Sequence, residues 1–290
     1  MAWNSTILLI SSHVARGSVG NRVMGFALER LGMTVWEAPT IILPHHPGQG
    51  PAERIVPEED AFAALLNDLA DAGAGRIDAI LSGYLGTSAQ TDHVADLVRR
   101  VKDASPDCLY LCDPVIGDNG SLYVIDRIAE TIRDHLLPLA DIATPNAFEC
   151  AWLAGEDDWE TADLAAAAER LAPPTVIVTS SPALMRGHIG NLLVGAGDRL
   201  MAEHPTVESH AKGTGDIFSA LYLGRILEGR TPRKALEMAA ATTFEMIAAA
   251  AKQGLDDLPV TQLQTAISQP HAMINLRLFA PGVSGRPRPL

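Results

Sequence analysis

The chain has 290 residues, of which 47% are hydrophobic, which is enough for one large core or two smaller domains. Its net charge of -13 argues against non-specific binding to nucleic acid and against an anionic membrane surface. The three cysteines form no even disulfide framework, and we expect them to be buried thiols: Cys108, Cys112 and Cys150. No charged segment precedes the short apolar run at the N-terminus, so the expected compartment is the cytoplasm.

Short β-rich runs alternate with longer helical patterns, which is typical of a parallel sheet covered by helices on both faces. The expected strands are residues 7–10, 34–38, 41–43, 79–81, 108–112, 141–143 and 175–178, the last followed by a hairpin over 183–194. The expected helices end at Gly32 and Gly73, cover 88–102, start after Asn146, and run from 216 to about 253 and from 259 to about 268. Residues 11–13 are expected to form a polar turn.

The segment 44–51 is too rich in proline and glycine for a helix or a central strand, so we expect a functional loop. Its adjacent His45 and His46 could bind a metal ion. Because no third ligand is nearby in the sequence, a substrate-loop or surface role is favoured.

Polar residues follow several expected strands at their carboxyl ends, the edge where open α/β sheets bind ligands. Tyr84 could stack there on a planar substrate, or it could pack on the core. Asp113 and Asp118 follow one strand and suit Mg²⁺ held mostly through water. Glu149, in the first turn of the helix after Asn146, could be a capping acid.

The stretch from Lys212 to Asp216 places two glycines one residue apart, just before an apolar helical run. Gly213 and Gly215 allow successive backbone N–H groups to converge on one point, and the helix adds its positive N-terminal end. This pattern predicts an anion-binding site. Asp216 could cap the first turn of the helix or lie beside the bound anion as a base, and the stretch alone favours neither.

Several segments, taken together, resemble one known family. They are Ser11–Val14, Gly17–Asn21, Leu81–Gly86, Leu109–Asp118, Ala143–Glu149 and Gly213–Asp216, in this order. The set is similar to that of the pyridoxal kinases of the ribokinase-like (PfkB) superfamily and covers nearly the whole chain. The resemblance implies one three-layer α/β/α kinase domain over 1–280, with a mostly parallel central sheet and no separate lid domain, generally paired as a homodimer. Residues 281–290, rich in proline, are expected to be a disordered tail.

The resemblance implies phosphoryl transfer from ATP to the 5′-hydroxymethyl group of pyridoxal, and of pyridoxine and pyridoxamine. The product from pyridoxal would be pyridoxal 5′-phosphate, in vitamin B6 salvage. Asp216 would accept the hydroxyl proton. The backbone N–H groups of Gly213, Thr214 and Gly215, with that of Asp216, would stabilise the transferring group.

Other site residues are implied by the same resemblance. Mg²⁺ would accompany ATP, held largely through water by Asp113 and Glu149, and a monovalent cation is a further candidate ion. The residues expected around the pyridine ring are Ser12, His46, Tyr84 and Asp216. The residues expected at ATP are Asp113, Asp118, Asn146, Glu149, Thr179, Ser180, Gly213 and Gly215.

The sequence departs from the family pattern at two places. The substrate loop of the family usually reads Asn-His-Thr-Gly-Tyr-Gly, so Pro47 and Gln49 here replace a hydroxyl and an aromatic ring. Lys212 stands where relatives commonly have a neutral residue, and its ammonium could meet an ATP phosphate or point to solvent. Two alternatives therefore stay open: a hydroxymethylpyrimidine kinase, and a pyridoxal-binding relative with little turnover.

Overall fold

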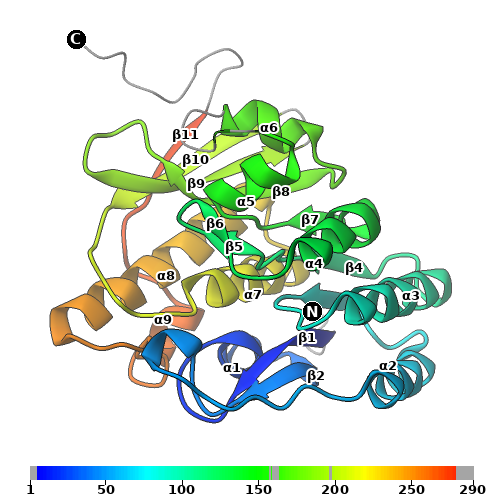
Figure 1. Cartoon of the computed structure of the whole chain (residues 1–290). Helices are drawn as coiled ribbons and strands as arrows, with labels where there is room; N and C mark the ends of the chain where they lie inside the picture. The colour runs from blue at the N-terminus through cyan, green and yellow to red at the C-terminus, as the bar shows by residue number, and fades with distance from the viewer. Residues whose placement is uncertain (1–4, 157, 159–162, 196–197, 279–290) are drawn as a thin grey trace.

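The computed structural model describes residues 5–156, 158, 163–195 and 198–278. Within these residues one nine-stranded sheet has the order β11-β10-β9-β8-β7-β4-β3-β1-β2 (Figure 1). The strands are β1 (Thr6–Val14), β2 (Thr34–Leu43), β3 (Ala79–Ser82), β4 (Leu109–Cys112), β7 (Ile142–Ala143), β8 (Thr175–Pro182), β9 (His188–Gly195), β10 (Asp198–Pro205) and β11 (Asn275–Leu278). Strands from β2 to β8 pair in parallel, whereas β8 to β11 pair antiparallel. The expected mostly parallel sheet is confirmed.

Helices cover both faces of this sheet. They are α1 (Gly20–Arg30), α2 (Glu59–Gly73), α3 (Ser88–Ala104), α4 (Asp126–Thr131), α5 (Ala147–Leu153), α6 (Leu164–Arg170), α7 (Thr214–Leu227), α8 (Pro232–Gln253) and α9 (Gln264–Ser268), with short helical turns η1 (Pro47–Gln49), η2 (Ile132–Leu136) and η3 (Leu137–Leu139). Along β1, Ile7 and Leu9 pack with α1, α7 and α8, whereas Leu8 and Ile10 pack with α2 and α3. This period of two gives the expected three layers. No helix of the described residues is long and apolar enough to cross a membrane.

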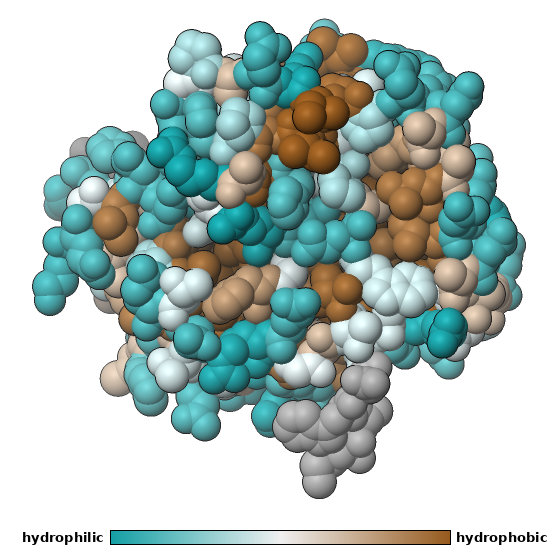
Figure 2. Space-filling view, turned by 90° about the horizontal axis from the view of Figure 1, so that it is seen from below, coloured by the Kyte–Doolittle hydropathy of each residue, from teal (hydrophilic) through white to brown (hydrophobic). Residues whose placement is uncertain are grey.

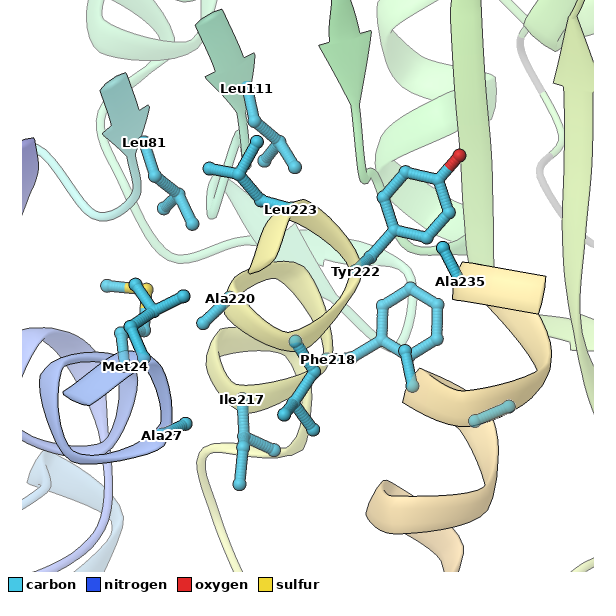
Figure 3. Packing of buried hydrophobic residues seen from close by; sticks show 14 of the residues in the cluster. Met24, Ala27, Leu81, Leu111, Ile217, Phe218, Ala220, Tyr222, Leu223 and Ala235 are labelled. Carbon is cyan, nitrogen blue, oxygen red and sulfur yellow. The ribbon is translucent and has the colours of Figure 1, made fainter. Parts of the chain in front are cut away.

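Helix α7 lies at the centre of one layer. All residues from Ile217 to Arg225 are buried. Figure 3 shows Ile217 and Ala220 toward α1, Leu223 beside Leu111 of β4, and the rings of Phe218 and Tyr222 near α8. Since burying a large apolar side chain contributes roughly 1.5–3 kcal/mol, packing holds α7 firmly in place.

Several expected boundaries are wrong. The polar run 11–13 does not form a turn, because β1 continues through it and pairs with Ile42 and Leu43 of β2 after a register shift. The last helix begins at Gln264 rather than 259, because residues 260–263 form turns; Ser18 Oγ donates a hydrogen bond to the carbonyl of Leu258 just before them. A short helical turn, η1, forms in the loop that was expected to contain none. Strand β11 was not expected, and the proposed tail 281–290 lies outside the described residues.

Candidate active site

The N-terminus of α7 is open to an anion. Its N-cap, Gly213, has φ of +90° and no side chain caps the helix, so the first N–H groups have no partner within it. A Cβ at Gly213 would lie 1.9 Å from the carbonyl oxygen of Ser18, which is why only glycine fits. A Cβ at Gly215 would meet nothing within 4 Å. Space is therefore open where a phosphate would sit.

Asp216 faces a second helix N-terminus instead of capping its own. Its carboxyl group accepts a hydrogen bond from the backbone N–H of Gly20, the first residue of α1. Gly20 also packs on Ser12, since a Cβ there would lie 2.1 Å from the Ser12 carbonyl oxygen. Burial raises the pKa of Asp216, and the bond from Gly20 opposes the rise. The structure thus brings Ser12, the uncapped start of α7 and Asp216 together, and Asp216 is a stronger base than an exposed aspartate.

Asp113 lies just beyond β4 and is buried at 6% exposure. Its Oδ2 accepts a hydrogen bond of 2.9 Å from Ser219 Oγ, which also lies 2.8 Å from Thr144 Oγ1. Burial, with the nearby charges of Glu149 and Asp216, holds the pKa of Asp113 well above its usual range, against the lowering effect of Ser219. Three acids expected in the site are therefore close enough to influence one another.

Glu149 is a capping acid, as one interpretation of the sequence expected. It forms a capping box with Asn146, N-cap of α5: Asn146 Oδ1 accepts from the N–H of Glu149, and Glu149 Oε2 accepts from the N–H of Asn146, each at 2.9 Å. Its Oε1 accepts from the N–H groups of Ile116 and Gly117, at 2.7 Å and 3.2 Å. Burial raises the pKa of Glu149 to about 7, against these backbone bonds. Glu149 thereby fixes the loop that follows Asp113.

The remaining nucleotide candidates lie along the same edge of the sheet. Asp118 is exposed in the small hairpin of β5 (Gly117–Asp118) and β6 (Ser121–Leu122). Asn146 Nδ2 donates to the carbonyl of Gly117 at 2.8 Å. Thr179 forms a parallel bridge with Asn146, and Ser180 after it has φ of +53°. These residues line one edge, as the parallel topology requires.

No group of three or more His, Cys, Asp or Glu side chains in the described part of the chain could hold a metal ion. The suggested metal role of His45 and His46 gains no support from the geometry. Asp113 Oδ1 makes no hydrogen bond to the described residues, whereas both Glu149 oxygens are occupied. This donor set fits an ion that keeps most of its water, as Mg²⁺ does.

The substrate loop is ordered around His46. His46 is the N-cap of η1, and its Nδ1 accepts from the N–H of Gly48 at 2.9 Å. Burial lowers the pKa of His46, and the charge of Lys212 lowers it further. Lys212 is exposed, as the solvent alternative expected, and its Cε lies 3.8 Å from where a Cβ of Gly48 would stand.

Tyr84 packs partly on the core, as one of the two sequence interpretations expected, whereas its stacking on a substrate stays a prediction. It packs against the cluster of Val14, Val19, Ile41 and Leu43, and it is only partly buried. Its N–H donates to Ser11 Oγ at 3.1 Å, which fixes its backbone just beyond β3. The ring is thus supported by the core and remains accessible at the sheet edge.

Comparisons with known proteins show which family the chain belongs to. The model of the phosphomethylpyrimidine kinase family matches residues 56–261. The pyridoxal kinase PdxY of Corynebacterium diphtheriae is 34% identical over 282 residues, covering 94% of this chain and 99% of the relative. That of Granulibacter bethesdensis is 37% identical over 265 residues, covering 86% and 91%. The chain belongs to the pyridoxal kinase family.

A solved pyridoxal kinase supports the assignment. The enzyme of Leishmania donovani, in complex with ADP and pyridoxamine, superposes with a TM-score of 0.86 at 28% identity, covering 95% of this chain and all of that one. A nucleotide-using kinase fold is therefore shared along the chain.

Three residues at the site of this pyridoxal kinase family member were missed by sequence reasoning. Ser219 follows Asp216 by one helical turn, and that spacing was an available signal. Gly20 gave a weaker signal, as the glycine before a helical pattern. Asp257 gave none, because its contact with Gln49 joins residues 208 positions apart.

Proposed function

We propose that this chain transfers the γ-phosphoryl group of ATP to the 5′-hydroxymethyl group of pyridoxal, and of the related vitamers pyridoxine and pyridoxamine. The observation that carries the proposal is the uncapped N-terminus of α7 beside the Asp216 carboxyl group. An anion-binding helix end next to a base is what transfer to an alcohol needs. The relatives named pyridoxal kinase supply the choice of alcohol.

Asp216 accepts the hydroxyl proton in this mechanism. Its raised pKa favours proton uptake, while the bond from Gly20 keeps the carboxyl group oriented. The N–H groups at the start of α7 offset charge on the transferring oxygens. Three side chains surround the pyridine ring in this mechanism: Ser12, His46 and Tyr84. The residues at the nucleotide are Asp118, Asn146, Thr179 and Ser180.

Mg²⁺ is the ion that we propose to accompany ATP, and it would neutralise charge on the phosphate oxygens. Asp113 would hold it through water by the oxygen that Ser219 leaves unused. Glu149 acts indirectly in this proposal. It accepts hydrogen bonds from the N–H groups of Ile116 and Gly117 and so fixes the loop that follows Asp113. A monovalent cation is a second ion that we propose for the site, and the family resemblance is its ground.

The test is turnover by the purified chain with ATP, Mg²⁺ and a panel of alcohols. We expect pyridoxal 5′-phosphate from pyridoxal, with hydroxymethylpyrimidine a poorer substrate. Preference for the pyrimidine would establish the rival kinase. Binding of pyridoxal without turnover of any alcohol would establish the weakly active relative.

We also infer that the chain pairs as a homodimer. Figure 2 shows the face on which α1 and β2 lie, where apolar side chains form separate patches among hydrophilic ones. Ile42 and Ile55, joined by an antiparallel bridge at the sheet edge, are 39% and 65% exposed. Light scattering at micromolar concentration measures the molar mass in solution. A mass equal to that of one chain would rule out the homodimer.

A further inference from the structure

A cavity of about 1150 Å³ lies beside η1. Three segments that are distant in sequence supply much of its wall: Arg16–Ser18 after β1, Gly48 and Gln49 of the substrate loop, and Gly254–Gln262 after α8. Ser12, Tyr84 and Asp216 are not among its lining residues. The cavity is therefore distinct from the proposed ring site, and Gly48 and Gln49 connect it to the substrate loop, which the proposed function places at the ring.

One side chain connects the three segments. Gln49 Oε1 accepts a hydrogen bond from Arg16 Nη2, and Gln49 Nε2 donates one to Asp257 Oδ1, both at 3.3 Å. An amide can do this because it carries an acceptor and a donor at one end. Both bonds join the amide to a charged side chain, but at 3.3 Å each is longer than a typical charge-assisted hydrogen bond.

The chain is built to bring Asp257 to this position. Gly17 has φ of +110°, and a Cβ there would lie 2.9 Å from Asp257 Oδ1, so any larger residue would crowd the carboxylate. Ser18 Oγ donates to the carbonyl of Leu258 at 3.0 Å, which holds the same loop.

The Asp257 segment also reaches the anion hole. Asp257 forms a parallel bridge with Lys212, which immediately precedes Gly213. Gln49 thus fastens the substrate loop to the backbone that leads into α7.

We propose that Gln49 is a positioning residue for the substrate, which fixes η1 so that His46 meets the pyridine ring in one orientation. The inference rests on the proposed function and names a role for a position where the family usually has tyrosine. Because His46 Nδ1 already accepts from Gly48, its neutral ring carries the proton on Nε2 and offers the substrate a donor. Burial and the charge of Lys212 lower the pKa of His46 and favour that neutral form, although the nearby charge of Asp257 opposes them.

The first test is Gln49→Ala, assayed with pyridoxal and with ATP as separately varied substrates. We expect the KM for pyridoxal to rise about 5- to 30-fold, the worth of one or two weak hydrogen bonds. The kcat and the KM for ATP should stay within about twofold, because the anion hole and Asp216 are untouched. Gln262→Ala is the matched control, an exposed glutamine lining the same cavity, and should change neither constant.

The second test reverses the donor and acceptor. Gln49→Glu keeps an acceptor for Arg16 but sets two carboxylates face to face, so its KM for pyridoxal should rise at least as far as that of Gln49→Ala. Adding Asp257→Asn returns a donor opposite the new carboxylate and should bring KM back to within about threefold of wild type. General loss of structure would not be repaired in this way.

The outcomes separate this inference from the proposed function. An unchanged KM in Gln49→Ala, or no recovery in the reversed pair, overturns the positioning role while leaving the kinase assignment intact. Wild-type protein that phosphorylates no vitamer overturns the proposed function. Calorimetric titration of each variant with pyridoxal reports the same order of affinities without turnover, so a variant of low activity still decides the question.

Discussion

Ser219 Oγ donates a hydrogen bond of 2.9 Å to Asp113 Oδ2, and so joins α7 to the end of β4 across 106 positions of sequence. A hydroxyl has one proton, so Ser219 can only accept from Thr144, 2.8 Å away. The three groups form an ordered chain that ends on a buried carboxylate. The hydrogen bond from Ser219 favours the ionised form of Asp113, and so opposes the rise in the pKa of Asp113 that burial causes.

We expect Ser219→Ala to lower the free energy of unfolding by about 1–3 kcal/mol, because a buried acceptor loses its donor. It should also raise the Mg²⁺ concentration for half-maximal activity, since Asp113 is less well oriented. Denaturant unfolding and a Mg²⁺ titration measure the two effects. Thr144→Val, which removes only the outer hydroxyl, should give a smaller change in both; a larger change than in Ser219→Ala would contradict the order of the chain.

Asp216→Asn should lower turnover by about 10²- to 10⁴-fold, the usual contribution of a positioned base. Asparagine retains an oxygen for the N–H of Gly20 but cannot take the proton, so folding and ATP affinity should change little. Single-turnover rates, with calorimetry of ATP binding, make the comparison. Rates equal to those of the wild type would show that Asp216 is not the base and that its role is limited to its contact with α1.

The substitutions Asp113→Ala and Glu149→Ala should affect different properties: the first the Mg²⁺ requirement, the second the stability. Loss of Asp113 removes the oxygen proposed to face the water of Mg²⁺, so the metal requirement should rise. Loss of Glu149 leaves the N–H groups of Ile116, Gly117 and Asn146 without their acceptor, and we expect stability to fall by about 2–4 kcal/mol. Melting curves and Mg²⁺ titrations on both variants separate these effects. An Asp113→Ala enzyme with an unaltered Mg²⁺ requirement would remove that residue from the metal site.

The pH dependence of stability should report Glu149. Its pKa rises from 4.5 to about 7 on folding, so the folded state binds the extra proton between these values. The stabilisation that Glu149 gives the folded state is fully present below the pKa of Glu149 in the unfolded chain. It is lost as the pH rises through the pKa of Glu149 in the folded chain. In Mg²⁺-free buffer, unfolding free energy should therefore fall between about pH 5 and about pH 8 by on the order of 3 kcal/mol more in wild type than in Glu149→Gln. Parallel profiles for the two proteins would show that Glu149 stays ionised throughout.

Much of the fold was predictable because its signals are local. The apolar runs of β1 and β3, the glycines that end α1 and α2, and the stretch from Gly213 to Asp216 each act within a few neighbouring residues. Parallel strands then place their carboxyl ends at one edge by topology, so Asp113 and Asn146 could be assigned to one site before their contacts were known.

By itself the sequence determined the three-layer arrangement, the glycine-rich start of α7 and the candidate acids, since each depends on residues that are adjacent or one turn apart. Tertiary structure alone decided what those acids contact. Asp216 meets the start of α1, Glu149 holds a neighbouring loop, and Gln49 reaches Asp257. These pairings depend on where strand ends and helix ends meet after packing, and a hydrogen bond forms only between groups brought within about 3 Å. The separation of two residues along the sequence gives no information on the distance between them in space when whole helices and strands lie between them.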